Sequence, residues 1–157
     1  MKLEVNSTQE MQQLGAVIAQ TAQAHDLLLL NGDLGAGKTT LTQGIGRELG
    51  IKRPVKSPTF TIVREYPEAR LPLYHMDFYR LEEDDLSSID LNAYLAEPGI
   101  VVIEWPEIVQ EQLPETFLEI TIKRVDDSWD STKRIVEFAP KGSRNKQWAE
   151  NIIEKIS

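Results

Sequence analysis

An apolar run that ends in a glycine-rich loop constrains this chain more than any other feature. Residues 27–41 read LLLLNGDLGAGKTTL, in which four leucines precede a match to the pattern G-x-x-x-x-G-K-[ST]. The leucines predict a buried strand, and Leu41, Ile45 and Leu49 recur at helical spacing until Gly50. Glycines let the backbone turn tightly and present its N–H groups to phosphate oxygens. Strand, glycine loop and helix in this order predict a phosphate-binding P-loop.

The predicted loop contains residues that would bind the phosphates of a nucleotide and Mg²⁺. Lys38 would reach the β- and γ-phosphates, and the Thr39 hydroxyl would ligate the metal. The helix that follows would add its positive N-terminal end. The predicted contact residues are Gly32, Asp33, Leu34, Gly35, Ala36, Gly37, Lys38, Thr39 and Thr40. The alternative is a glycine-rich turn that happens to precede a helix.

Two further predicted strands carry an acid at or near their ends. The apolar run IVVI leads into Glu104, and the strand 73–78 contains Asp77. A buried strand beside a P-loop can aim such a carboxylate at Mg²⁺ and the attacking water. We predict that Glu104 and Asp77 are catalytic and metal-binding residues, although a lone Asp at a strand end is often a turn former. For His75 and Trp105 we favour structural roles, since the motif chemistry needs neither side chain.

Residues elsewhere in the chain are candidates for further nucleotide contacts, each with an ordinary structural alternative. Thr8 lies at the start of a helix that the capping box of Ser7 and Glu10 predicts, so it either caps this helix or contacts the base or ribose.

Ser57 and Thr59 follow the P-loop helix, where related P-loop proteins have phosphate-sensing switches, and an ordinary loop into a strand is the alternative. Lys133 and Arg134 lie either beside the nucleotide or on a polar sheet face.

Length and composition limit the possible functions. The 157 residues predict one domain, 1–157, with a sizeable core. A formal net charge of −8 makes the chain by itself a poor candidate for holding RNA or DNA. The lack of cysteine excludes disulfides, thiol chemistry and Cys-based zinc sites. Because no stretch approaches the length of a membrane span, we expect a cytoplasmic protein with no membrane partner.

The end of the chain predicts a β-hairpin followed by a helix. Residues 117–125 and 133–138 have the composition of strands, and 126–131 form the loop between them. Trp148, Ile152 and Ile156 recur every four residues within a closing helix.

Two features that would assign the P-loop to other enzyme classes are missing. A GTPase reads guanine with N-K-x-D, and the nearest string, NKQW at 145–148, lacks the aspartate. A small-molecule kinase usually carries an arginine-bearing lid, and no arginine-rich segment is present. A small-molecule or nucleoside kinase and a nucleotide-gated binding module nevertheless stay open as alternatives.

Four motifs together resemble a known family, the bacterial tRNA threonylcarbamoyladenosine biosynthesis proteins TsaE, also called YjeE. They are GDLGAGKTT from Gly32, SPTF from Ser57, HMDFYR from His75 and IEWP from Ile103. The resemblance covers most of the chain, residues 5–140. It implies an α/β fold, a P-loop NTPase-like domain whose central mixed, largely parallel sheet is flanked by helices and carries the antiparallel C-terminal hairpin.

The resemblance also implies an activity and partners. The expected activity is Mg²⁺-dependent ATP hydrolysis, weak alone and raised by the partner proteins TsaD and TsaB. Those partners would build the threonylcarbamoyl group on adenosine 37 of tRNAs that read codons beginning with A, so this chain would meet tRNA only indirectly. Ser57 and Thr59 would sense the γ-phosphate, and Thr8 with Lys133 and Arg134 would lie near the base.

Overall fold

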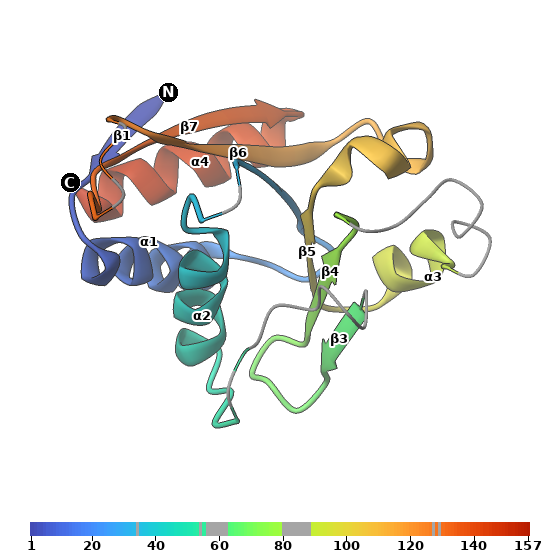
Figure 1. The fold of residues 1–157 in the computed structure, drawn as a ribbon. Coiled ribbons are helices and arrows are strands. Elements are labelled where there is room, and N and C mark those ends of the chain that lie inside the picture. The colour runs from blue at the N-terminus through green and yellow to red at the C-terminus, as the bar shows by residue number, and fades with distance from the viewer. Residues whose placement is uncertain (34, 54, 56–62, 80–88, 127, 129) are drawn as a thin grey trace.

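The computed structural model describes the chain except for residues 34, 54, 56–62, 80–88, 127 and 129 (Figure 1). Its elements in chain order are β1 (Lys2–Val5), α1 (Thr8–Thr21), β2 (Leu27–Asn31), α2 (Lys38–Glu48), β3 (Val63–Tyr66), β4 (Leu73–Asp77), α3 (Leu91–Ala96), β5 (Ile100–Glu104), the 3₁₀ helix η2 (Pro106–Gln112), β6 (Phe117–Arg124), β7 (Arg134–Lys141) and α4 (Ser143–Ile156). Among the helices described, none has both the length and the apolar character needed to span a bilayer.

The strands form one mixed sheet in the order β1-β7-β6-β2-β5-β4-β3. Strands β6, β2, β5 and β4 pair in parallel, whereas β7 is antiparallel to both β6 and β1, and β3 is antiparallel to β4. The strand of four leucines, β2, therefore lies inside the sheet between two parallel neighbours. The predicted fold class, including the antiparallel C-terminal hairpin β6–β7, is confirmed.

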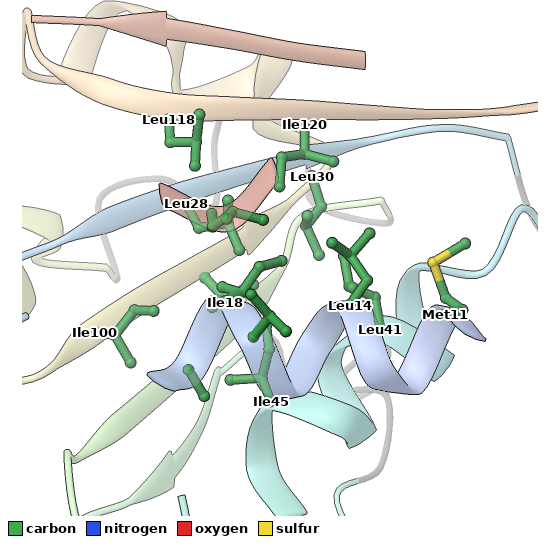
Figure 2. Packing of buried hydrophobic residues seen from close by; sticks show 14 of the residues in the cluster. Met11, Leu14, Ile18, Leu28, Leu30, Leu41, Ile45, Ile100, Leu118 and Ile120 are labelled. Carbon is green, nitrogen blue, oxygen red and sulfur yellow. The ribbon is translucent and has the colours of Figure 1, made fainter. Parts of the chain in front are cut away.

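Helices cover both faces of β2, which explains why its apolar residues do not alternate with polar ones. Leu28 and Leu30 belong to the larger core, which lies between the sheet and the helices α1, α2 and α4. In Figure 2 they lie above Leu14 and Ile18 of α1. Leu27 and Leu29 face the other way, into a smaller core with residues of α3 and η2. Successive side chains of a strand point to opposite faces, so one leucine run serves both cores.

The helices α1 and α2 approach so closely that only glycine fits where they cross. A Cβ on Gly44 of α2 would lie 2.3 Å from the carbonyl oxygen of Gln12. A Cβ on Gly15 of α1 would lie 2.3 Å from the carbonyl oxygen of Leu41. This crossing holds α2, and thus the loop that precedes it, against the start of α1.

Local signals placed most boundaries well. Ser7 caps α1, accepting a hydrogen bond from the Glu10 backbone N–H at 3.0 Å, as the capping box predicts. Strand β7 runs to Lys141, beyond the predicted end at residue 138, because pairing with β6 continues as far as Phe117. The helix η2 was not predicted. Residues 59–66 have the β-branched and aromatic composition of a strand, and the structure describes this strand from Val63 onward.

Candidate nucleotide-binding site

The glycine loop adopts a backbone that other residues adopt poorly. Gly32 and Gly37 have φ values of 149° and 120°, in the region that L side chains avoid. Space is also limited, since a Cβ on Gly32 would lie 2.7 Å from the Ile122 carbonyl oxygen. Gly37 is the N-cap of α2, and Lys38 is the first residue of this helix. The loop thus joins the end of β2 directly to the N-terminus of α2.

The two predicted acids are neighbours at the C-terminal ends of two adjacent parallel strands. Asp77 and Glu104 are the last residues of β4 and β5, and they are partners in the parallel register. Glu104 is also the partner of Leu30 on β2, one residue before that strand ends. Both acids are almost fully buried, with 5% and 2% of their surfaces exposed. The register therefore brings both carboxylates to the strand ends beside the loop.

Lys38 extends into this acidic environment. Its Nζ donates a hydrogen bond of 2.7 Å to the Gly32 carbonyl and lies 3.7 Å from the ring centroid of Trp105. Burial lowers the pKa of Lys38, and nearby carboxylates oppose that shift. These carboxylates belong to Glu104, Asp77, Glu107 and Asp33.

Trp105 places its ring over Lys38 by means of an unusual backbone. Directly after Glu104, it adopts left-handed dihedrals, φ 56° and ψ 60°, which are uncommon for a bulky residue. Its ring also packs on Tyr79, with the ring centroids 4.8 Å apart. Sequence reasoning assigned Trp105 only a structural role. Its position immediately after a strand-end acid was the signal for a place in the site.

His75 is the second residue whose place in the site the sequence did not indicate. Its Nε2 lies 2.5 Å from Oε2 of Glu104, and its side chain is completely buried. His75 precedes Asp77 by two residues on β4, so both side chains face the same side of the sheet. This i, i+2 spacing was the available signal, but the partner lies on a different strand.

A small pocket lies on the side of the loop nearest to α1 and β7. Its volume is about 120 Å³, and it is lined by Ser7, Thr8, Met11, Gly35, Ala36, Gly37, Thr40, Thr132 and Arg134. The Arg134 Nε donates a hydrogen bond of 2.7 Å to the Ala36 carbonyl, and burial lowers the pKa of Arg134. The structure thus brings Thr8, Thr40 and Arg134 together beside the loop. Lys133 is exposed next to them and does not line the pocket.

The structure brings Lys38, Asp77, Glu104 and the described loop glycines into one site. Thr39 follows Lys38 in the first turn of α2 and is partly exposed. Leu34, Ser57 and Thr59 lie outside the described residues.

The donors at this site fit Mg²⁺, which prefers carboxylate, hydroxyl and phosphate oxygens. Within the described part of the chain, no group of three or more His, Cys, Asp or Glu side chains forms a metal site by itself. A bound Mg²⁺ would therefore depend on phosphate and water oxygens as well as on Thr39, Asp77 and Glu104, which is its usual situation in nucleotide sites.

A loop of this sequence between a central strand and a helix places the chain in the class of P-loop NTPase-like proteins. The family model "Threonylcarbamoyl adenosine biosynthesis protein TsaE" matches residues 5–135. The chain belongs to the TsaE family.

Curated relatives and a solved structure agree with this assignment. The tRNA threonylcarbamoyladenosine biosynthesis protein TsaE of Bacillus subtilis (strain 168) is 41% identical over 152 residues, which cover 97% of this chain and 93% of that protein. The protein of the same name from Nostoc sp. is 46% identical over 118 residues, covering 73% and 72%. The crystal structure of Bacillus subtilis YdiB matches with a TM-score of 0.86 and 36% identity, covering all of this chain and 96% of YdiB.

Proposed function

We propose that this chain is a Mg²⁺-dependent ATPase that supports threonylcarbamoylation of tRNA without forming the bond itself. The observation that carries the proposal is the in-register pairing of Asp77 and Glu104 beside the glycine loop and Lys38. Positive charge, oxygen ligands and a backbone phosphate cradle are the parts that phosphoryl transfer to water requires. The names of the relatives supply the biological process, tRNA threonylcarbamoyladenosine biosynthesis.

Each residue of the site has a defined task in this proposal. The Lys38 ammonium exchanges its contact with the Gly32 carbonyl for the β- and γ-phosphate oxygens of ATP. The Thr39 hydroxyl, Asp77 and Glu104 hold Mg²⁺, either directly or through water. When bound, Mg²⁺ neutralises charge on the phosphate oxygens. The carboxylate of Glu104 also orients the attacking water.

The pocket beside Thr8 and Arg134 is proposed to receive the ribose or base. It adjoins the loop residues Gly35–Gly37, so a nucleotide whose phosphates lie in the loop extends toward it. Arg134 holds the Ala36 carbonyl through its Nε, which leaves the wall of the pocket fixed in position. Ser57 and Thr59 remain a proposed switch that senses the γ-phosphate.

The acidic character of the chain supports a proposal in which its partners bind the RNA. A protein with a formal charge of −8 lacks the excess of Lys and Arg that holds a phosphate backbone. We propose that TsaD and TsaB bind the tRNA and make the modification in the cytoplasm, and that ATP turnover by this chain supports repeated rounds.

The test is ATP hydrolysis by the purified chain, alone and with TsaD and TsaB, together with multiple-turnover modification of tRNA. We expect slow hydrolysis alone, stimulation by both partners together, and loss of both activities in Glu104→Gln. Lys146→Ala, at an exposed position on α4, is the control for an unrelated charge change. The proposal fails if the partners leave hydrolysis unchanged and repeated modification proceeds without this chain.

The same assay separates the alternatives. Transfer of labelled γ-phosphate to an acceptor other than water would make the protein a kinase. ATP-dependent binding to TsaD and TsaB that persists in Glu104→Gln, without hydrolysis by the wild type, would make it a nucleotide-gated binding module.

A further inference from the structure

We propose that His75 is a positioning residue that orients the Glu104 carboxylate for its role at the site. The inference deepens the proposed function and rests on it. It assigns a task to a buried group that the P-loop chemistry does not itself require.

The geometry places the imidazole directly against one oxygen of the acid. Nε2 of His75 lies 2.5 Å from Oε2 of Glu104, and the side-chain exposures of the two residues are 0% and 3%. When Glu104 is ionised, Nε2 of His75 carries a hydrogen and donates a hydrogen bond to Oε2. Oε1 is then the oxygen left to face a metal ion or water.

The surrounding strands make this contact rigid. His75 lies in the middle of β4 and is the register partner of Val102, two residues before Glu104 on β5. Every residue of both strands is buried. A glutamate side chain has several rotatable bonds, so the register fixes its backbone but not its carboxylate. The imidazole supplies the missing constraint from the neighbouring strand.

A purely structural role accounts poorly for an imidazole at this position. Within the described part of the chain, Nδ1 of His75 is buried without a hydrogen-bond partner. An apolar side chain would fill the same space without burying an unpaired polar atom, which is unfavourable. The favourable polar contact described for the ring is the one with Glu104. That contact is therefore the feature that distinguishes His75 from a hydrophobic core residue.

Partners that hold a site carboxylate typically change metal affinity or activity by about 10–100-fold when they are removed. We therefore expect His75→Phe to lower kcat for ATP by about 10–100-fold while KM for ATP changes by less than about threefold. His75→Gln, whose amide can donate from nearly the same place as Nε2, should recover most of that loss. His25→Asn is the matched control, since the second histidine is exposed and Asn tolerates its φ of 72°.

A double-mutant cycle tests whether His75 acts through Glu104. If it does, the double variant His75→Phe/Glu104→Gln hydrolyses ATP no more slowly than Glu104→Gln alone. His75→Phe leaves the buried Glu104 carboxylate without its imidazole partner, and the double variant removes that carboxylate. The double variant can therefore be measured even if His75→Phe alone does not fold. Additive losses, or equal activity in His75→Phe and the wild type, overturn the inference.

A readout without turnover separates this inference from the proposed function. In ¹⁵N NMR of the histidine rings, Glu104→Gln should shift the His75 signals and leave those of His25 unchanged. If the wild-type protein hydrolyses no ATP, either alone or with its partners, the proposed function is wrong. The NMR comparison then decides whether His75 holds Glu104, and unchanged His75 signals overturn that contact.

Discussion

At the scale of single residues, Lys38 combines two opposed effects. Burial disfavours its charge, while four surrounding carboxylates favour it, and the net result is a lowered pKa. A bound phosphate group would add negative charge in direct contact with this lysine. The residue is therefore suited to binding phosphate at some expense of stability.

Removing this charge should weaken nucleotide binding and stabilise the fold. Lys38→Met should lower affinity for ATP–Mg²⁺ by at least about 10-fold in calorimetry, since a charge-assisted contact is lost. At pH 7 it should unfold at a higher urea concentration than the wild type. Below the folded-state pKa the buried ammonium costs stability, and this cost disappears as pH rises through that value toward the ordinary 10.5.

The stability gain of Lys38→Met should therefore shrink between pH 7 and pH values near 10.5. Lys146→Ala, on the exposed side of α4, is the control and should leave both the nucleotide affinity and the pH dependence of stability unchanged. A stability gain in Lys38→Met that does not vary with pH would contradict this account.

The sequence predicted the site residues whose roles depend on local pattern and missed those that depend on register. Lys38 and Glu104 stand in recognisable positions, after a glycine loop and at the end of an apolar strand. His75 is separated from Glu104 by 29 residues, and only the pairing of β4 with β5 brings them together. The position of the Trp105 ring depends on left-handed backbone dihedrals. Sequence reasoning expects such dihedrals mainly at glycine or asparagine and not at a tryptophan.

At the scale of elements, the position of the loop depends on how α1 and α2 cross. The backbones meet at Gly15 and Gly44, with no room for a methyl group on either side. Because α2 begins directly after the loop, a shift of this helix also moves Lys38.

Gly44→Ala should therefore destabilise the protein although alanine is the better helix former. The added Cβ would lie 2.3 Å from the Gln12 carbonyl oxygen and 2.8 Å from its Cα, so the helices must move apart. We expect a loss of about 1–3 kcal/mol in the free energy of unfolding, measured by urea denaturation. Gln43→Ala, at the exposed neighbouring position, is the control and should change stability by less than about 0.5 kcal/mol. Unchanged or increased stability in Gly44→Ala would refute the close crossing.

Hydrophobic patterns were sufficient to predict individual elements but not their order in the sheet. The four leucines of β2 and the terminal hairpin were recognisable because their signals are local. The placement of β7 between β6 and β1 depends on residues that are distant in sequence. The helix η2 has no clear apolar period and follows a strained residue, so no local signal indicated it.

At the scale of the whole molecule, charge determines which ligands can bind without help. The formal net charge is −8, and the candidate site itself contains several carboxylates around one lysine. Repulsion therefore acts on polyanions at long range, whereas the nucleotide that we propose for the site would carry a charge reduced by Mg²⁺.

The purified chain should consequently show little affinity for tRNA at physiological salt. In a gel-shift or filter-binding assay we expect no saturation at micromolar protein, with or without ATP–Mg²⁺. TsaD and TsaB, mixed with the same tRNA, serve as the positive control. Tight binding by this chain alone, falling steeply with added salt, would show a phosphate-binding surface that its composition does not predict.

The pairing of β1 with β7 has a consequence for how the protein folds during synthesis. Lys2 lies opposite Glu137 and Val5 opposite Arg134, so β1 pairs with a strand that is synthesised long after it. Arg134 also holds the Ala36 carbonyl. Contacts between residues so distant in sequence form late, since the whole intervening chain must be closed into a loop. The glycine loop is therefore translated long before Arg134, and its final support arrives only after β7 has been synthesised.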